Sequence, residues 1–367
     1  MLHKPLSAKL SEDLLQSSSS YFSDSYQISR EQFLSQFDAY NGEKQAWFCP
    51  LASNLDAQLG TDVICLGQQT AANVLVFMSG THGVEGFCGS AIQQFYLKQL
   101  SPENIPADTA IVMIHSLNPW GMYWARRCDQ SGIDLNRNFV DYRNVPDLDP
   151  NYDAILDTLM RSSNRYQEMQ RQCEQWGQQD FDRIFSGGQY VHKWAPFYGG
   201  NAPAHGRKVI EQVILQFELA SKNTRVIDLH TGLGPWAFGE LICDHPVNSN
   251  GHLEAVSVFG PAIANAHQGD SFSVPKLGLL DYGFHPFMNE KGFFLTLEFG
   301  TYGSAALFEV LLNDHVFWRD QAPAQLDEPN YQVYRERMIE HFCPKQALWQ
   351  QAVLFKAWQV LNHMLQD

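Results

Sequence analysis

Residues 73–86 read NVLVFMSGTHGVEG, and this stretch indicates the class of fold that the chain adopts. Residues 74–78 are all apolar, which is typical of a strand that is buried on both faces of a sheet. Ser79 and Gly80 end this strand, and residues 90–97 follow with the spacing of a helix. The stretch therefore predicts the strand, loop and helix of an α/β unit.

The same alternation of apolar strands and helices continues along the chain. Further buried strands are predicted at residues 109–114, 225–229, 240–243 and 293–297, with shorter candidates at 46–49 and 63–66. Helices are predicted at residues 152–176, 207–221, 304–312 and 329–366. The predicted fold class is therefore α/β, with a central sheet that is flanked by helices.

The composition of the chain excludes several classes of protein. With 25 Lys and Arg against 40 Asp and Glu, the net charge is −15, so the average surface repels phosphate backbones and anionic lipids. We therefore expect no nucleic-acid or membrane partner. No apolar run approaches the roughly 18 residues that cross a bilayer, and residues 1–20 lack the apolar region of a secretory signal. The seven cysteines include no C-x-x-C pair, which argues against a thiolate zinc site, and we expect a cytoplasmic protein.

Polar residues with metal-binding side chains follow three of the predicted strands. His82 and Glu85 lie after the first strand, His230 after a later one, and Glu298 after the last. The ligand crevice of an open α/β sheet lies beyond the carboxyl ends of its strands, so we expect these side chains to meet. Two histidines and one carboxylate with an open fourth position are typical of catalytic zinc. The alternative for His230 is a buried histidine at the end of a strand with an ordinary hydrogen bond, and the spacing of His82 and Glu85 also occurs by chance.

Glu298 places a carboxylate within the otherwise apolar run of residues 293–299. An unpaired charge is costly in such a strand, so this residue is expected to be paired or functional. Beside a metal it could take a proton from water and pass it to a leaving amine. The structural alternative is an ion pair with an arginine, or a helix cap.

A cluster of basic and polar residues lies between positions 118 and 139 of a chain that is otherwise poor in basic residues. Its members include Arg126, Arg127, Asp134, Asn136 and Arg137. Arginine binds carboxylates through two parallel hydrogen bonds and asparagine adds directional ones, so the cluster predicts a clamp for a substrate carboxylate or an oxyanion. The alternative is a solvated charged loop.

In order and spacing these residues resemble the zinc carboxypeptidase superfamily, the carboxypeptidase A-like metallopeptidases. The resemblance rests on His82-x-x-Glu85, Asn118-Pro-x-Gly121, Arg127, Gly132-x-Asp134-x-Asn136-Arg137-Asn138, Asp228-x-His230 and Glu298. Tyr21-Phe-x-x-Ser-Tyr26, Gly187-Gly-Gln-Tyr190 and Phe197-Tyr-Gly-Gly200 are also similar to a bacterial branch of carboxypeptidase-like proteins without an assigned substrate. The resemblance implies a zinc carboxypeptidase-like (phosphorylase/hydrolase-like) fold with a mixed, eight-stranded central sheet.

The resemblance also implies a role for each residue of the site. One zinc ion would be held by His82, Glu85 and His230, and Asp134 would orient His82 from behind. Glu298 would be the general base. Arg127 would polarise the scissile carbonyl. The candidates for substrate binding are Asn136, Arg137, Arg126 and Tyr282. Arg126 and Arg127 are adjacent, and the spacing from Asp134 favours Arg127 as the one that faces the site.

We predict one α/β catalytic domain over residues 1–367, although a chain above roughly 250 to 300 residues is also long enough for two domains. Residues 1–45 are predicted to form a helical N-terminal extension. Residues 141–206 are polar and then rich in Gly, Pro and aromatic side chains, so they are predicted to be an insertion on the rim of the cleft.

The predicted function is zinc-dependent hydrolysis of a C-terminal peptide or peptide-like amide bond in a small peptide or N-acyl amino acid. One alternative is a deacylase or amidase of the aspartoacylase or succinylglutamate desuccinylase type, and a peptidoglycan-peptide amidase is another. A non-catalytic module that binds carboxylates or peptides is the alternative from a different class. The run Gly232-Leu-Gly234-Pro-Trp-Ala237 matches a dinucleotide fingerprint in spacing, but Pro235 and Trp236 do not open a helix convincingly.

Overall fold

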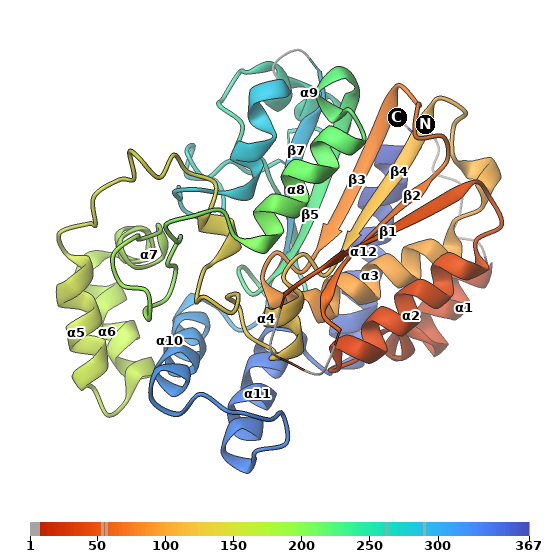
Figure 1. The fold of residues 1–367 in the computed structure, drawn as a ribbon. Helices are drawn as coiled ribbons and strands as arrows, with labels where there is room; N and C mark the ends of the chain where they lie inside the picture. The colour runs from red at the N-terminus through yellow and green to blue at the C-terminus, as the bar shows by residue number, and fades with distance from the viewer. Residues whose placement is uncertain (1–7, 53–54, 56–57, 262, 289–290, 367) are drawn as a thin grey trace.

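The computed structural model describes residues 8–52, 55, 58–261, 263–288 and 291–366. Within these residues the centre of the fold is a seven-stranded sheet in the order β1-β2-β4-β3-β5-β7-β6 (Figure 1). The strands are β1 Lys44–Pro50, β2 Gly60–Leu66, β3 Asn73–Ser79, β4 Thr109–His115, β5 Asn223–Thr231, β6 Gly239–Ile242 and β7 Phe293–Phe299. The predicted α/β class with a mixed sheet is confirmed, whereas the described sheet has seven strands and not the eight implied by the resemblance.

The middle of the sheet consists of four parallel strands, β4, β3, β5 and β7. Val76 of β3 pairs with Val112 of β4 on one side and with Val226 of β5 on the other. All three valines are buried. β-branched side chains suit a strand that is covered on both faces, which explains why the apolar runs in the sequence predicted these strands.

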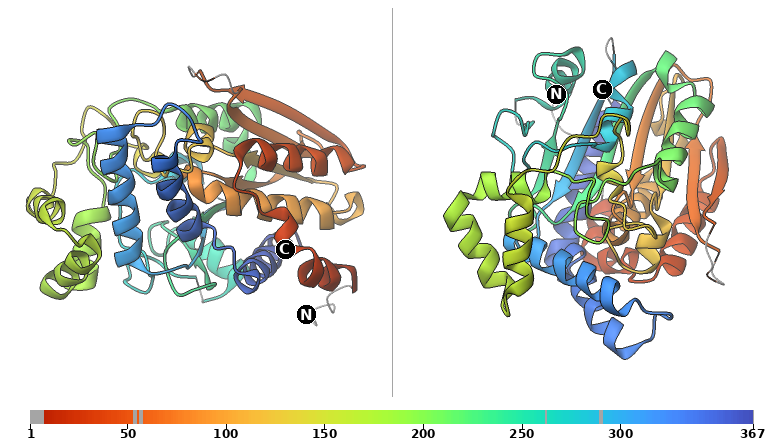
Figure 2. Two further views of the ribbon diagram at one scale, coloured as in Figure 1. Left: turned by 90° about the horizontal axis from the view of Figure 1, so that it is seen from below. Right: turned by 60° about the vertical axis from the view of Figure 1, so that its left-hand side comes forward.

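Helices cover both faces of the sheet (Figures 1 and 2). Leu75 and Phe77 of β3 face one core, to which α2 Tyr26–Ala39, α3 Gly86–Gln99 and α12 Ala347–Gln366 contribute. Val74 and Val76 face a second core together with α8 His205–Gln216. Since successive side chains of a strand point to opposite faces, one apolar run supplies both cores.

The other helices are α1 Ala8–Gln16, α4 Pro119–Tyr123, α5 Tyr152–Arg161, α6 Arg165–Trp176, α7 Gln178–Ser186, α9 Asn250–Phe259, α10 Ser304–Gln321 and α11 Pro329–Phe342. None of the helices that the structure describes combines the length and the apolar character that crossing a membrane requires. The chain therefore presents its helices as layers on a sheet, as the sequence predicts.

Two of the predicted helices are each split in two, and α10 is longer than predicted. The helix predicted at 152–176 breaks before Asn164, whose side chain accepts a hydrogen bond from the backbone of Gln167 and caps α6. The helix predicted at 329–366 is broken between α11 and α12, where Pro344 disfavours helical backbone in the preceding residue. In both cases a local capping or proline effect overrides the helical spacing of the apolar residues.

The two predicted additions differ in position: the segment 141–206 contacts α10 beside the central layers, whereas α2 of the N-terminal extension packs on one face of the sheet. Between residues 141 and 206, α5, α6 and α7 form a group that contacts α10 (Figures 1 and 2). The extension predicted at 1–45 contains α1 and α2, but its last two residues already belong to β1, and its first seven lie outside the described residues. The division into one catalytic domain with two additions stays a prediction.

A buried ion pair connects the segment after α4 to α10. Arg126 Nη2 lies 2.8 Å from Asp314 Oδ2, and both side chains are nearly inaccessible to solvent. The guanidinium also lies over the ring of Trp318, with 4.5 Å between Cζ and the ring centroid. Because both charges are out of water, each depends on the other for compensation.

We predict that Asp314→Ala lowers the free energy of unfolding by about 3–5 kcal/mol, since it leaves the Arg126 charge buried and unpaired. Urea unfolding followed by circular dichroism measures this change. Asp320→Ala is the matched control, because Asp320 pairs with Arg319 at the exposed end of the same helix. An effect of Asp314→Ala as small as that of the control would contradict a structural role for the pair.

Candidate metal centre

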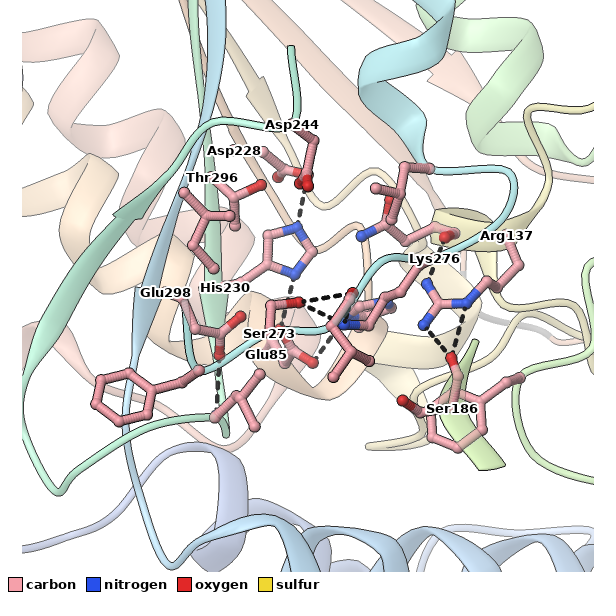
Figure 3. Close-up of a pocket in the computed structure, with 18 of the residues that line it drawn as sticks. Glu85, Arg137, Ser186, Asp228, His230, Asp244, Ser273, Lys276, Thr296 and Glu298 are labelled. Carbon is pink, nitrogen blue, oxygen red and sulfur yellow. Dashed lines mark hydrogen bonds and ion pairs between the residues drawn. The ribbon is translucent and has the colours of Figure 1, made fainter. Parts of the chain in front are cut away.

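The side chains predicted to bind metal lie together at the carboxyl ends of neighbouring strands. His82 and Glu85 follow β3, and His230 lies near the end of β5, paired in register with Glu298 of β7. One ligand atom from each of His82, Glu85 and His230 lies within 4.8 Å of the others. Figure 3 shows Glu85 and His230 pointing toward each other in the pocket. In the part of the chain that the structure describes, no other trio of such side chains is as close.

The turn that carries His82 and Glu85 is fixed by its packing against the segment of the two arginines. The backbone N–H of Gly83 donates to the Arg127 carbonyl at 3.2 Å, and that of Val84 donates to the Arg126 carbonyl at 2.9 Å. A Cβ atom on Gly83 would lie 2.1 Å from the backbone carbon of Gly121. Only glycine therefore allows this close approach, which sets the position of the two ligand residues.

Both histidines are held by carboxylates from behind. His82 Nε2 lies 3.1 Å from Asp134 Oδ1, and His230 Nε2 lies 2.7 Å from Asp228 Oδ2. The opposite nitrogens face Glu85, with Nδ1 of His82 at 2.8 Å and Nδ1 of His230 at 3.2 Å. A carboxylate behind a metal-binding imidazole fixes the ring and increases its basicity.

The donor set fits a divalent cation such as zinc. A neutral imidazole has one N–H, so a ring that donates through Nε2 presents a lone pair at Nδ1. On His82 and His230 these lone pairs would face the Glu85 carboxylate, and all three side chains are buried. A cation among them relieves this repulsion, and two imidazole nitrogens with one carboxylate oxygen leave a fourth position for water or substrate.

Glu298 lines the same pocket beside this set. Its Oε1 accepts a hydrogen bond of 3.0 Å from the backbone N–H of Leu233. Burial, with a further contribution from Glu85, raises the pKa of Glu298 to about 7. No arginine or lysine forms an ion pair with Glu298 in the described part of the chain, so the ion-pair alternative is not observed.

Arg127 is the member of the arginine pair that faces the pocket. Its Nε donates to Asp134 Oδ2 at 2.9 Å, and its Nη1 donates to Glu85 Oε1 at 3.2 Å. Asp134 thus contacts both His82 and Arg127, and it has no solvent exposure. The arrangement holds a guanidinium group next to the candidate metal ligands in a single orientation.

Asn136 and Arg137 also line the pocket. Asn136 Oδ1 accepts a hydrogen bond of 2.8 Å from the backbone N–H of Leu280. Arg137 is fully buried, and its Nη2 and Nε donate to the carbonyl of Ser186 at 2.7 and 3.2 Å. Because Ser186 ends α7, the segment 141–206 holds this arginine in place (Figure 3).

Two of the predicted substrate contacts, Arg126 and Tyr282, lie away from the pocket of the candidate metal ligands. Arg126 turns away from the pocket to its ion pair with Asp314, since adjacent residues of this segment point in different directions. Tyr282 donates its hydroxyl to the Lys276 carbonyl at 3.1 Å and lines a separate pocket with His245 and His285. Neither side chain lines the pocket that contains the candidate metal ligands.

The structure adds pocket residues that the sequence did not identify. The motif Asp228-x-His230 predicts no role for Asp228 itself. Asp228 lies two positions before His230 on β5, so its side chain is on the same face of the sheet, and this spacing could have identified it. Asp182 and Ser186 lie on α7, a helix that the sequence did not predict. Asp244, Ser273 and Lys276 lie in loops, where no periodicity marks the inward side.

Comparisons with known proteins agree with this fold. A family model described as protein of unknown function (DUF2817) matches residues 22–356. The comparison with curated proteins gives no match. Bovine thrombin-activatable fibrinolysis inhibitor, solved in complex with tick carboxypeptidase inhibitor, is similar over 94% of this chain and 100% of its own, with 12% identity and a TM-score of 0.50.

Two bacterial structures are similar at lower TM-scores. Succinylglutamate desuccinylase from Chromobacterium violaceum is 13% identical, with a TM-score of 0.37, over 84% of this chain and 77% of its own. Murein-tripeptide amidase MpaA from Escherichia coli O157 is 17% identical, with a TM-score of 0.39, over 79% and 97%. At such identities similarity concerns the fold alone, and the bovine structure confirms that the predicted zinc carboxypeptidase-like fold is correct.

We predict that Asp228→Asn weakens zinc binding by about 10- to 100-fold, because an amide supports the His230 ring less well than a carboxylate. Competition with a chromophoric chelator measures the dissociation constant. Asp157→Asn, which changes an exposed carboxylate on α5, is the control and should leave it unchanged. Equal affinities for all three proteins would show that Asp228 does not support a metal ligand.

Proposed function

The chain belongs to the DUF2817 family of proteins of unknown function, and we propose for it the activity of a zinc-dependent hydrolase of C-terminal peptide or peptide-like amide bonds. The observation that carries the proposal is the buried group of His82, Glu85 and His230, whose ligand atoms lie within 4.8 Å of one another. Glu298 and Arg127 line the same pocket. These are the groups that amide hydrolysis requires: metal ligands, a base and a fixed positive charge.

Zinc held by His82, Glu85 and His230 would supply a Lewis acid that lowers the pKa of water and polarises a carbonyl group. Glu298 moves the protons. With Oε1 held by the Leu233 N–H, its Oε2, which has no hydrogen-bond partner among the described residues, is available to accept a proton from water. The Glu298 carboxylate, buried beside the candidate metal ligands, can accept that proton and then release it to the leaving amine.

Arg127 would stabilise the negative charge that develops on the carbonyl oxygen. Two of its N–H groups are committed to Asp134 and Glu85, and a guanidinium has five. The remaining donors are held at the pocket in a buried environment, where a fixed charge acts more strongly than in water.

Arg137 and Asn136 would bind the terminal carboxylate of the substrate. Arg137 is a buried cation, and within the described residues no carboxylate lies within ion-pair distance of it. Only backbone carbonyls accept its hydrogen bonds. A substrate carboxylate would supply the missing negative charge, and two parallel hydrogen bonds would fix its orientation. Small peptides and N-acyl amino acids both carry such a group.

We predict that Glu298→Gln lowers kcat by about 10²- to 10⁴-fold because an amide cannot accept the proton. Turnover is measured on N-acyl dipeptides and on N-acyl amino acids, with the zinc-loaded protein. The zinc content of the variant should equal that of the wild type, since Glu298 is not one of the three proposed ligands.

Asp157→Asn serves as the control for loss of one carboxylate at the surface and should retain full turnover. Undiminished turnover in Glu298→Gln would overturn the assignment of the base. Absence of turnover on both substrate classes by zinc-loaded wild-type protein would overturn the proposed hydrolase function. Cleavage of N-acyl amino acids alone would identify a deacylase in place of a carboxypeptidase.

A further inference from the structure

The pocket continues along β7 from Glu298 toward the beginning of the strand, to an end that we call the inner end. Glu298 and Thr296 both line the pocket, and two residues along a strand correspond to about 6.6 Å. Thr296 pairs with Ile242 of β6, and Asp244 follows two residues later and also lines the pocket. In Figure 3 Asp244 and Thr296 lie on one side of the His230 ring and Glu298 lies on the other. Asp244 therefore belongs to the inner end of the pocket.

Two carboxylates at this inner end lack hydrogen-bond donors. Asp244 is half-buried, and within the described residues it has no hydrogen bond and no ion pair. Asp281 is only 4% exposed, and its Oδ1 has no hydrogen-bond partner, while Oδ2 lies 3.3 Å from Nε2 of His285. Burial, and then the neighbouring Asp281, raise the pKa of Asp244 to about 7. The buried Oδ1 of Asp281 lacks a donor, which is costly, and the Asp244 carboxylate lines the pocket without a partner, so this end favours a ligand that donates hydrogen bonds.

The one lysine that lines the pocket is bonded to its own loop. Lys276 Nζ donates to the Ser273 hydroxyl and, at 3.1 Å, to the Val274 carbonyl. The backbone of this loop is fixed by a 2.8 Å hydrogen bond from the Leu277 N–H to the Gly187 carbonyl. Lys276 forms no ion pair with Asp244. The groups that still need a partner at this end are therefore acceptors.

We propose, building on the proposed function, that the inner end of the pocket selects a released residue whose side chain ends in an ammonium group, with Asp244 as the specificity-determining residue. A substrate whose carboxylate is bound by Arg137 and whose amide lies at Glu298 would direct that side chain inward. It must extend by about one strand repeat, roughly 6–7 Å, which a four-carbon stem with a terminal ammonium does. Asp281 adds negative potential at the same place.

Binding of free amino acids tests the proposal without turnover. Isothermal titration of the zinc-loaded protein with L-lysine, L-norleucine and L-glutamate compares three side chains of similar length and different charge. We expect lysine to bind at least about tenfold more tightly than norleucine, because a desolvated charge pair is lost in norleucine. Equal binding of lysine and norleucine, or tighter binding of glutamate, would overturn the proposal.

Variants assign the effect to Asp244. Asp244→Asn, which keeps the shape of the side chain, should reduce the ratio of lysine to norleucine affinity to about one. Asp157→Asn should leave this ratio unchanged, because its carboxylate lies on the exposed face of α5. Lys276→Met removes the competing cation and should maintain or increase the ratio. A preserved ratio in a folded Asp244→Asn protein with full zinc content would contradict the role of Asp244.

Turnover distinguishes failure of the inner end from failure of the proposed hydrolase. N-benzoylglycyl dipeptides that end in lysine, norleucine or glutamate are compared by kcat/KM, with preference for lysine expected. Selective binding of lysine without cleavage of any peptide would leave the subsite standing and refute peptide hydrolysis. Cleavage of all three peptides at similar kcat/KM would support the hydrolase and refute the selectivity.

Discussion

The organisation of the pocket depends on the placement of the Glu85 carboxylate between two imidazole rings. Each ring has a second carboxylate behind it, Asp134 for His82 and Asp228 for His230, so both nitrogens of both rings face negative oxygen. Buried charges of one sign require compensation within a few ångströms. Arg127 compensates part of it through Asp134 and Glu85, and a cation between the Nδ1 atoms would compensate the rest. The charge arrangement thus favours the metal binding that the proposed chemistry uses.

The segment 141–206 connects the periphery of the fold to this centre. Two consecutive carbonyls at the end of α7 fix groups that line the pocket: that of Ser186 binds the Arg137 guanidinium, and that of Gly187 binds the loop of Lys276. Gly188 adopts a φ of 114°, and a Cβ atom there would lie 2.8 Å from Cδ of Arg137. A side chain at this position would therefore displace the arginine proposed to bind the terminal carboxylate. The segment that is least regular in sequence thus supports the part of the pocket that is proposed to bind the substrate.

The sequence predicts most of the sheet and the polar residues that follow its strands. Val76 and its neighbours are apolar because they are covered on two faces, and a histidine or carboxylate at the end of such a strand stands out. Arg126 and Arg127 could not be separated with certainty because irregular backbone between α4 and the next turn has no periodicity that assigns a side. The inward direction of Lys276 and Asp244 depends on loops whose positions are set by tertiary hydrogen bonds, such as the one from Leu277 to Gly187. These contacts join residues far apart in the chain, so local patterns do not predict them.

The metal content of the purified protein tests the central claim most directly. The chain is purified without chelators and without a metal-affinity column, then analysed by mass spectrometry beside His82→Ala, His230→Ala and the control His267→Ala, which alters an exposed histidine. The account predicts about one zinc ion per chain in the wild type and the control, and loss of that ion in both ligand variants. Wild-type protein that contains no metal and takes up none when zinc is added would contradict it.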